Sequence, residues 1–339
     1  MSDSPPQEPN QPSDIQSPEP SFPVVGIGAS AGGLKAFETF FTHTPPDTGM
    51  AFILVQHLDP NHKSMLVELV ERYTRMTVLQ VTNGLSMKPN HVYIIPPNKD
   101  LALQQGELYL TDQEAPRGFR LPIDIFFRSL AEDLGNRAIC IVLSGTGSDG
   151  TLGLKAIKEV GGLTIVQKPS TAKYDGMPLN AIATDMADFV LPPEDIPQRL
   201  IDYVQHTQRI TREKSGSQTF YDTESLQAIF VLLRTQTGHD FSQYKKNTIL
   251  RRIERRMAVN QIATFVSYVR YLRQDTLEVD ALFKDLLIGV TGFFRDAEAF
   301  HIIEQDVIPA IFSDRLPGQD IRIWVCGCST GEEAYSFAI

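Results

Sequence analysis

The chain has 339 residues, 42% of them hydrophobic and 21% charged, and a formal net charge of −10 at pH 7. This composition is typical of folded globular proteins, and its acidity argues against nucleic acid as a partner. No run approaches the roughly 18 apolar residues of a membrane span and no signal peptide opens the chain, so no membrane insertion is expected. The three cysteines lie in apolar runs, which favours a reducing, cytoplasmic compartment without disulfides, and no Cys or His cluster predicts a metal site.

Residues 1–22 contain four acidic residues, no Lys or Arg, and many Pro, Ser and Gln residues. Such a segment buries too little apolar surface to offset the entropy that it would lose on ordering. The composition therefore predicts a disordered leader over 1–22.

Residues 23–206 alternate short apolar runs with longer amphipathic stretches. The short runs predict strands at 24–28, 51–56, 91–95, 138–143, 163–167 and 188–191. The amphipathic stretches predict helices at 33–42, 62–74, 122–134, 151–160 and 194–206, and residues 101–110 predict a hairpin that turns near Gln105. Alternation of strands and helices, with nearly continuous apolar strands, indicates an α/β domain with a doubly wound, mostly parallel sheet.

The composition changes after residue 206. Residues 207–220 are polar with a Ser/Gly centre, which predicts an interdomain linker. Residues 221–318 have helical periodicity and few strand signals, which predicts an all-α domain. Residues 319–339 return to a strand, a Gly-bearing turn and the start of a helix, as at the start of a Rossmann-like domain. Because that helix has hardly begun, we expect this chain to be the N-terminal part of a longer protein.

Three predicted strands are followed by residue types that carry out nucleophilic catalysis. Ser30 follows the first strand in GIGASAGG, His57 follows AFILVQ, and Asp149 lies in SGTGSDG after AICIVL. The carboxyl ends of parallel strands share one edge of a sheet, so these three residues can meet there. A serine nucleophile, a histidine base and an aspartate that orients the histidine form a hydrolytic triad. Asp149 also fits an N-cap of the helix that begins near Thr151, and this structural role stays open.

The first Gly-rich turn fits two patterns. The segment GASAG (28–32) matches the G-x-S-x-G turn that exposes a nucleophilic serine. The backbone N–H groups of Ala31 and Thr146 are candidates to hold an oxyanion beside that serine. The same turn matches G-x-G-x-x-A from Gly26 onward, a dinucleotide-binding pattern. A dinucleotide site requires an acid at the end of the next strand, where this chain has His57, so the hydrolase is favoured.

Four motifs stand in order between Val24 and His206, namely GIGASAGG, VQHLDP, SGTGSDG and YDGMPLNAIATDMADFVLPPEDI. Together they resemble the catalytic domain of CheB-type chemotaxis methylesterases. The resemblance implies hydrolysis of glutamate methyl esters on the cytoplasmic helices of chemoreceptors by Ser30, His57 and Asp149, without a cofactor. It also implies glutamine deamidation as a companion activity. The usual layout of the family includes a phospho-acceptor receiver domain, which the leader before Val24 does not provide, so control by phosphorylation in cis is not part of the prediction.

Three further motifs follow in order, RRIERRM (251–257), VTGFFRD (290–296) and CSTGEEAYS (328–336). They resemble CheR-type chemotaxis receptor methyltransferases from about Tyr221 onward. The resemblance implies a helical domain that docks on the receptor through a basic helix face formed by Arg251, Arg252, Arg255 and Arg256. A basic helix face is more often merely solvated, and this alternative stays open.

The same resemblance implies S-adenosylmethionine as the cofactor of the complete methyltransferase. Its implied contacts are Thr291, Arg295 and Glu333, since an arginine suits the methionine carboxylate and an acid suits the amino group. The family often has Asn before its VT or LT dipeptide, whereas this chain has Gly289, so that contact is not carried over. Because the later strands of the cofactor domain are absent, residues 1–339 alone are predicted not to transfer methyl groups.

The sequence therefore predicts the N-terminal part of a fused CheB–CheR protein. It comprises a complete methylesterase, a helical receptor-docking domain and a truncated methyltransferase start. Two other functions stay open. One is a signalling scaffold with a catalytically silent triad, and the other is a dinucleotide-binding oxidoreductase at the first Gly-rich turn.

Overall fold

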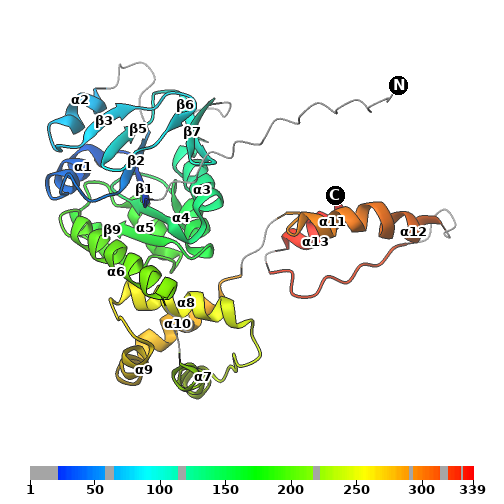
Figure 1. Ribbon diagram of the computed structural model, residues 1–339. Helices are drawn as coiled ribbons and strands as arrows, with labels where there is room; N and C mark the ends of the chain where they lie inside the picture. The colour runs from blue at the N-terminus through cyan, green and yellow to red at the C-terminus, as the bar shows by residue number, and fades with distance from the viewer. Residues whose placement is uncertain are drawn as a thin grey trace, which may run out of the picture. The chain divides into compact units, whose positions relative to one another are not determined.

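The computed structural model describes residues 22–57, 65–113, 120–216, 222–289, 293–313, 320–329 and 331–339 (Figure 1). They belong to two compact units, which divide between Leu282 and Phe283. No helix within these ranges is long and apolar enough to cross a bilayer. The predicted leader lies outside the described residues except for Phe22.

A parallel sheet of seven strands forms the centre of the first unit, in the order β10-β9-β8-β1-β2-β5-β3. Every neighbouring pair in this sheet is parallel. The strands are β1 (Val24–Ala29), β2 (Ala51–Gln56), β3 (Thr77–Gln80), β5 (His91–Ile94), β8 (Ala138–Val142), β9 (Leu163–Gln167) and β10 (Phe189–Leu191). The predicted α/β class and parallel sheet are confirmed, and β3 is an addition to the predicted strands.

Helices cover both faces of this sheet, as a doubly wound fold requires. They are α1 (Gly33–Thr42), α2 (Leu66–Glu71), α3 (Pro122–Leu134), α4 (Thr151–Glu159), α5 (Gly176–Ala183) and α6 (Ile196–Gly216), with short turns η1 (Gly135–Arg137) and η2 (Pro169–Thr171). Apolar side chains of α1, α2 and α6 join one core cluster, and those of α3, α4 and α5 join the other. Alternate residues of each strand contribute to the two clusters, which is why the strand sequences are almost continuously apolar.

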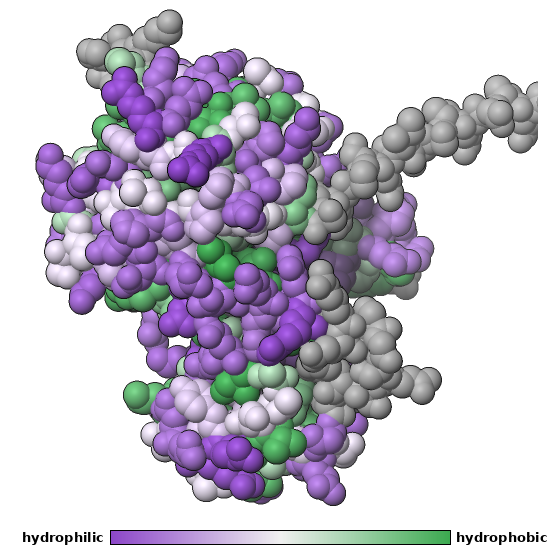
Figure 2. Space-filling model, turned by 60° about the vertical axis from the view of Figure 1, so that its left-hand side comes forward, coloured by the Kyte–Doolittle hydropathy of each residue, from purple (hydrophilic) through white to green (hydrophobic). Residues whose placement is uncertain are grey.

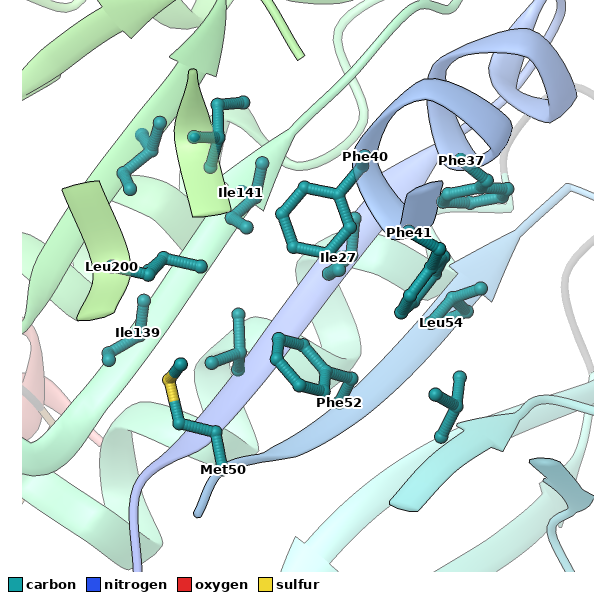
Figure 3. Packing of buried hydrophobic residues seen from close by; sticks show 14 of the residues in the cluster. Ile27, Phe37, Phe40, Phe41, Met50, Phe52, Leu54, Ile139, Ile141 and Leu200 are labelled. Atoms are coloured by element: carbon teal, nitrogen blue, oxygen red, sulfur yellow. The ribbon is translucent and has the colours of Figure 1, made fainter. Parts of the chain in front are cut away.

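The core beneath α1 shows why this helix forms where it does. Phe37, Phe40 and Phe41 recur at helical spacing and lie over the sheet (Figure 3). The rings of Phe40 and Phe41 each meet the Phe52 ring edge-on, with ring centroids 5.9 Å apart. Burial of these rings and their edge-to-face contacts hold α1 on the sheet. Because α1 begins at Gly33, this core also holds the turn that carries Ser30.

Strand β1 has glycine at two positions where α3 packs against it. A Cβ atom at Gly28 would lie 2.4 Å from Cγ2 of Ile123, and one at Gly26 would lie 2.9 Å from a ring carbon of Phe127. Both distances are too short for a normal contact, so glycine lets α3 approach β1 closely. This approach brings the first turn of α3 to the edge of the sheet where the candidate site lies.

A small antiparallel sheet adjoins the main one, in the order β4-β7-β6. Its strands are β4 (Leu85–Ser86), β6 (Lys99–Gln104) and β7 (Glu107–Asp112). The predicted hairpin turns at Gln105 and Gly106, which both have positive φ and donate their N–H groups to the Asp133 carboxylate. Asp133, a residue of α3, therefore fixes this turn.

The predicted linker over 207–220 is wrong for most of its length, because α6 continues to Gly216. The apolar face of α6 continues past residue 206, since Tyr203 and Ile210, seven residues apart, are both buried. Two helical turns separate positions seven apart, so both side chains lie on the same face. His206 is also buried, and the polar residues between occupy the other faces. Residues 217–220 lie outside the described part.

The first part of the predicted all-α region consists of helices. They are α7 (Thr223–Thr237), α8 (Lys246–Val259), α9 (Phe265–Gln274) and α10 (Thr276–Leu287). The side chains of Asp222 and Thr264 cap α7 and α9 by accepting backbone N–H bonds from Ser225 and Ser267. These caps explain why the two helices begin where they do.

The second unit contains α11 (Ala297–Ile302), the π-helical turn η3 (Ile303–Val307), α12 (Ile308–Ser313) and α13 (Glu332–Ala338). The strand predicted in IRIWV (321–325) is wrong, because residues 320–329 form no strand. A strand requires hydrogen bonds to a neighbouring strand, and the described residues of this unit provide none. Trp324 is accordingly 89% exposed. The predicted helix start is present as α13.

Candidate active site

The sheet register brings the three predicted catalytic segments together. Strand β1 lies between β2 and β8, with Ala29 opposite Gln56 and Gly28 opposite Val142. The residue after β1 is Ser30, whose N–H donates to the Ser144 carbonyl at 3.0 Å. The His57 N–H donates to the Ala29 carbonyl at 3.4 Å. The first residues beyond the strands therefore share the carboxyl edge, as the sequence predicts.

His57 and Asp149 are joined directly. Nε2 of His57 lies 2.7 Å from Oδ2 of Asp149, although the residues are 92 positions apart. The histidine side chain is 34% exposed and the aspartate side chain 2% exposed. A buried carboxylate of this kind fixes the ring and its tautomer, so that Nε2 donates and Nδ1 is left as the proton acceptor.

Three backbone N–H groups hold the other lone pairs of Asp149. Ile123 N–H donates to Oδ2 at 3.0 Å, while Asp124 N–H and Gly150 N–H donate to Oδ1 at 2.9 Å each. Two of these donors belong to the first turn of α3, where N–H groups have no intrahelical acceptor. These bonds fix the direction from which the carboxylate contacts His57. Asp149 is not bonded as an N-cap of α4, whose N-cap residue is Gly150 without a side-chain cap.

Two further carboxyl groups lie near Asp149. Burial raises the pKa of Asp124, the hydrogen bond from Gly153 lowers it, and the charge of Asp149 raises it further. Burial also raises the pKa of Asp100, and the charge of Asp149 raises it further. Asp124 accepts the Gly153 N–H at 2.6 Å and so ties α3 to α4 on either side of Asp149.

A buried hydroxyl supports the Ser30 turn. Ser144 Oγ accepts the Tyr174 N–H at 3.0 Å and lies 3.0 Å from the Ala31 carbonyl oxygen, to which it can donate. Gly32 follows with φ of 77°, and a Cβ there would lie 2.7 Å from Ser144 Oγ. Glycine is therefore needed at that position for both conformation and space.

The predicted oxyanion donors are Ala31, the residue after Ser30, and Thr146, in the loop that follows β8. Within the described part of the chain, the N–H groups of Ala31 and Thr146 have no hydrogen-bond acceptor. Asn180 holds the second loop by donating from Nδ2 to the Gly147 carbonyl at 2.9 Å. A Cβ at Gly145 would lie 2.9 Å from Cβ of Ser30, which shows how closely the two loops approach.

The structure does not join Ser30 to His57. Among the hydrogen bonds of the described residues, none involves Ser30 Oγ. Catalytic hydrogen bonds are often long in the absence of substrate. The position of Ser30 and His57 on the same edge of the sheet is therefore what bears on catalysis. Ser30 is partly exposed and can be reached from solvent.

The dinucleotide pattern has a different explanation. Gly26 and Gly28 lie within β1 rather than in a turn, and side chains of α3 fill the space beside them. A phosphate-binding pattern requires its glycines at the turn, where backbone can approach the ligand. The spacing of these two glycines is therefore a packing feature of β1 and α3.

The predicted receptor-docking face is wrong for three of its four arginines. Arg252, Arg255 and Arg256 are buried, and only Arg251 is exposed. Arg252 donates to backbone carbonyls at the end of α4, Arg255 to those of the two glycines before β9, and Arg256 pairs with Glu278. Buried charged groups need such partners, so these side chains face protein rather than solvent.

The predicted cofactor contacts lie in the second unit. Thr291 lies outside the described residues, while Arg295 and Glu333 are both exposed. Their segments adjoin, because the Phe294 N–H donates to Ser336 Oγ at 2.8 Å. The two motifs therefore meet, although the structure gives no contact between Arg295 and Glu333.

Sequence reasoning missed the residues that support the site. Ser144, Asn180 and Asp124 are polar residues without a motif of their own, although Ser144 directly follows a predicted strand, which is a usable signal. Their partners lie 25 or more positions away in sequence for most of the bonds that they make. A local pattern does not show such contacts.

A parallel α/β sheet with serine, histidine and aspartate at its carboxyl edge defines a class of proteins suited to nucleophilic hydrolysis. The chain belongs to the CheB methylesterase family, whose family model matches residues 25–200. The family model for the all-alpha domain of CheR methyltransferase matches residues 224–287, and that for its SAM binding domain matches residues 289–339. The chain therefore joins CheB-type and CheR-type segments, as the motifs predict.

Known proteins are similar to this chain over one or both of these segments. An uncharacterized 104.1 kDa protein of Rhodobacter capsulatus is 36% identical over 294 residues, which cover 81% of this chain and 31% of that protein. Protein-glutamate methylesterase/protein-glutamine glutaminase 4 of Burkholderia thailandensis is 35% identical over 191 residues, 56% of either chain. This chain thus spans less than two thirds of both relatives. The crystal structure of the Thermotoga maritima CheB methylesterase catalytic domain matches with a TM-score of 0.51 and 30% identity, covering 54% of this chain and 100% of that one.

Proposed function

We propose that residues 23–206 form a protein-glutamate methylesterase in which Ser30 is the nucleophile, His57 the base and Asp149 the orienting acid. The observation that carries this proposal is the His57–Asp149 pair, with the carboxylate held by three backbone N–H groups beside the Ser30 turn. Hydrogen bonds offset the cost of burying the carboxylate, and a buried carboxylate paired with a partly exposed histidine is typical of functional sites. The family match of residues 25–200 supports the same reaction.

The reaction follows from the positions of these groups. Ser30 Oγ attacks the ester carbonyl carbon while His57 Nδ1 takes the hydroxyl proton. The Ala31 and Thr146 N–H groups hold the oxyanion, and the C–O bond to methoxide then breaks. His57 returns its proton to the leaving group, which departs as methanol. Water, deprotonated by His57, next attacks the acyl carbon. The bond to Ser30 Oγ then breaks, Ser30 takes the proton back from His57, and the glutamate side chain is released.

The substrate in this proposal is the methylated cytoplasmic helix of a chemoreceptor, met in the cytoplasm. The face seen in Figure 2 is mostly hydrophilic. Exposed leucines occur on several elements near the carboxyl edge of the sheet. They are Leu34 of α1, Leu121 before α3, Leu152 of α4 and Leu179 of α5. An apolar rim of this kind suits one side of an amphipathic helix. Similarity to a relative named as a methylesterase and glutaminase supports glutamine deamidation at the same site.

The following segments, 221–318 and 319–339, are proposed to belong to a chemoreceptor glutamate methyltransferase. S-adenosylmethionine would supply the methyl group. Arg295 would hold its carboxylate and Glu333 its amino group, with Thr291 nearby. The exposed side chains of Arg295 and Glu333, on segments joined by the Phe294–Ser336 bond, fit one side of such a site. The family match of residues 289–339 supports this cofactor.

A serine-directed fluorophosphonate probe tests the esterase proposal. Labelling should fall on Ser30, identified by peptide mass spectrometry, and should be lost in His57→Ala because the hydroxyl is then no longer activated. Ser86→Ala is the matched control, since Ser86 is an exposed hydroxyl on β4 of the small antiparallel sheet and is not expected to react. Absence of labelling in the folded wild-type chain would favour the scaffold function instead.

A further inference from the structure

The arginines of α8 contact a part of the chain that lies outside the helical region. Arg252, Arg255 and Arg256 are buried, although the charge of an isolated basic helix face belongs in solvent. The partners of the first two lie in the CheB-type segment, about 93 positions earlier in the sequence. These contacts and all residues in them belong to one compact unit.

Two of the arginines bind backbone carbonyls at the end of α4. Arg252 donates to the carbonyls of Lys158 and Glu159 at 3.2 and 2.8 Å. Arg255 donates to those of Gly161 and Gly162, the latter at 2.8 Å. The last carbonyls of a helix have no intrahelical donor and carry partial negative charge, so a guanidinium satisfies them in both respects.

Arg255 also reaches a buried carboxylate. Asp188, whose side chain is 0% exposed, forms ion pairs with Lys158 at 2.6 Å and with Arg255, and Arg256 lies 3.9 Å away. Burial acts to raise the pKa of Asp188, but the charges of Arg255, Lys158 and Arg256 outweigh it and hold the pKa well below its usual range. Asp188 is thus an anion shared between the CheB-type segment and α8.

Apolar and neutral contacts surround these charges. Ala258 and Val259, at the end of α8, belong to the same core cluster as Tyr203 and Val204 of α6. Beyond α8, the Ile262 carbonyl oxygen lies 3.1 Å from Nε2 of His206. Gln261 donates to Asp202 at 3.2 Å. Contacts therefore extend from the end of α4 to the middle of α6, and Figure 1 shows α8 beside α6.

The position of these contacts relative to the candidate active site follows from strand direction. Gly162 precedes β9 and Asp188 precedes β10, so both lie at the amino edge of the sheet. Ser30 and His57 follow β1 and β2 at the carboxyl edge. The docked helix thus leaves the candidate active site uncovered.

We propose that the basic helix α8 is an intrachain docking element, which fastens the CheR-type helical domain permanently to the amino edge of the CheB-type domain. Its partner is the Asp188 carboxylate together with the backbone carbonyls at and just after the end of α4. In this chain the buried arginines are consequently not the surface that meets a receptor. The proposal does not depend on the esterase proposal, because it concerns association and not chemistry.

Cutting the folded chain tests this docking. A protease recognition sequence placed between Gly216 and Asp222 allows cleavage after folding, and gel filtration then shows whether the two pieces remain together. The wild-type pieces should co-elute at micromolar concentration, also in 0.5 M salt, because buried ion pairs are screened little. Arg255→Ala should weaken their association by about 100-fold or more, as expected when one partner of a buried ion pair is removed.

Arg251→Ala is the matched control, since Arg251 lies on the same helix and is exposed. It should leave the association unchanged. Arg255→Lys keeps the charge but loses the branched donor group, so it should weaken association while the chain still folds. Wild-type pieces that separate on cutting would overturn the proposal, as would equal weakening by Arg251→Ala and Arg255→Ala. Labelling of Ser30 by a serine-directed probe should be unchanged in the arginine variants, which separates this test from that of the esterase.

Discussion

Replacing Asp149 with Asn tests the proposed triad most sharply, because the structure predicts which way the amide must turn. Oδ2 of Asp149 accepts from His57 Nε2 and Ile123 N–H, and Oδ1 accepts from Asp124 N–H and Gly150 N–H. An Asn side chain has one carbonyl oxygen, so its NH₂ group must face one of these two pairs of donors.

The two orientations differ in what they leave unsatisfied. With the NH₂ group at the Oδ1 position, two buried N–H donors lose their acceptor, at about 1–3 kcal/mol each. With the NH₂ group at the Oδ2 position, only Ile123 N–H is orphaned, because the His57 ring can move its proton to Nδ1 and accept from the amide. The second orientation is therefore favoured. It puts the proton on the nitrogen that should receive the Ser30 proton.

The expected result of Asp149→Asn is a loss of about 10⁴ in kcat, the usual effect of a wrong histidine tautomer in a triad. Four decades correspond to about 5.4 kcal/mol of transition-state free energy. The melting temperature should fall as well, since at least one N–H is orphaned. Methanol release from a methylated receptor peptide measures the rate, and circular dichroism measures the folding.

Asp124→Asn is the matched control for this change. Asp124 is a neighbouring buried carboxyl that accepts the Gly153 N–H, and an Asn oxygen can accept that bond equally well. Its kcat should stay within about tenfold of the wild type, a range typical of groups that act only through packing. A folded Asp149→Asn variant with more than a tenth of wild-type activity would refute the reasoning.

Three further changes test other parts of the account. Gly28→Ala should lower the melting temperature and the activity, since the new Cβ would lie 2.4 Å from Ile123 and overpacking costs about 1–3 kcal/mol; unchanged unfolding would contradict the packing role of the glycine. Asp188 has a lowered pKa in the folded state, so the stability it contributes is present above its unfolded value of about 4 and is lost as the pH falls through and below that value. Asp188→Asn should therefore be less stable than wild type at pH 7, and urea unfolding should show this difference shrinking toward pH 3; a constant difference would contradict the ion pairing. Leu152→Ser should raise KM for a receptor helix roughly tenfold by removing apolar rim contact, whereas Leu277→Ser on α10, also exposed, should not; equal effects would argue against the rim.

The sheet could be predicted from the sequence because its strands are buried on both faces. Runs such as AFILVQ are apolar at nearly every position, which marks a central parallel strand and gives its bounds. Sheet geometry then predicts that the residues after those strands lie close together, and His57 and Asp149 do meet. Helix α5 was not predicted, because its sequence GMPLNAIA contains Pro and has only a weak amphipathic pattern.

Contacts between distant segments could not be predicted in this way. The sequence shows that α8 has an apolar and a basic face, but not that Asp188, 67 positions earlier than Arg255, lies buried beside it. The same holds for Ser144, which supports the Ser30 turn through Tyr174, 30 positions later. The linker prediction failed for a related reason, since Ile210 is one apolar residue among polar ones and its burial depends on what packs against α6.

The most direct test of the central claim is methanol release from methylated chemoreceptor helices by the wild-type chain and by Ser30→Ala. Loss of a triad nucleophile costs on the order of 10⁶ in kcat, so release by the wild type and none detectable from the variant is the predicted result. Equal release by both proteins, or no release from a folded wild type with a receptor helix at saturating concentration, would contradict the claim that Ser30 performs ester hydrolysis.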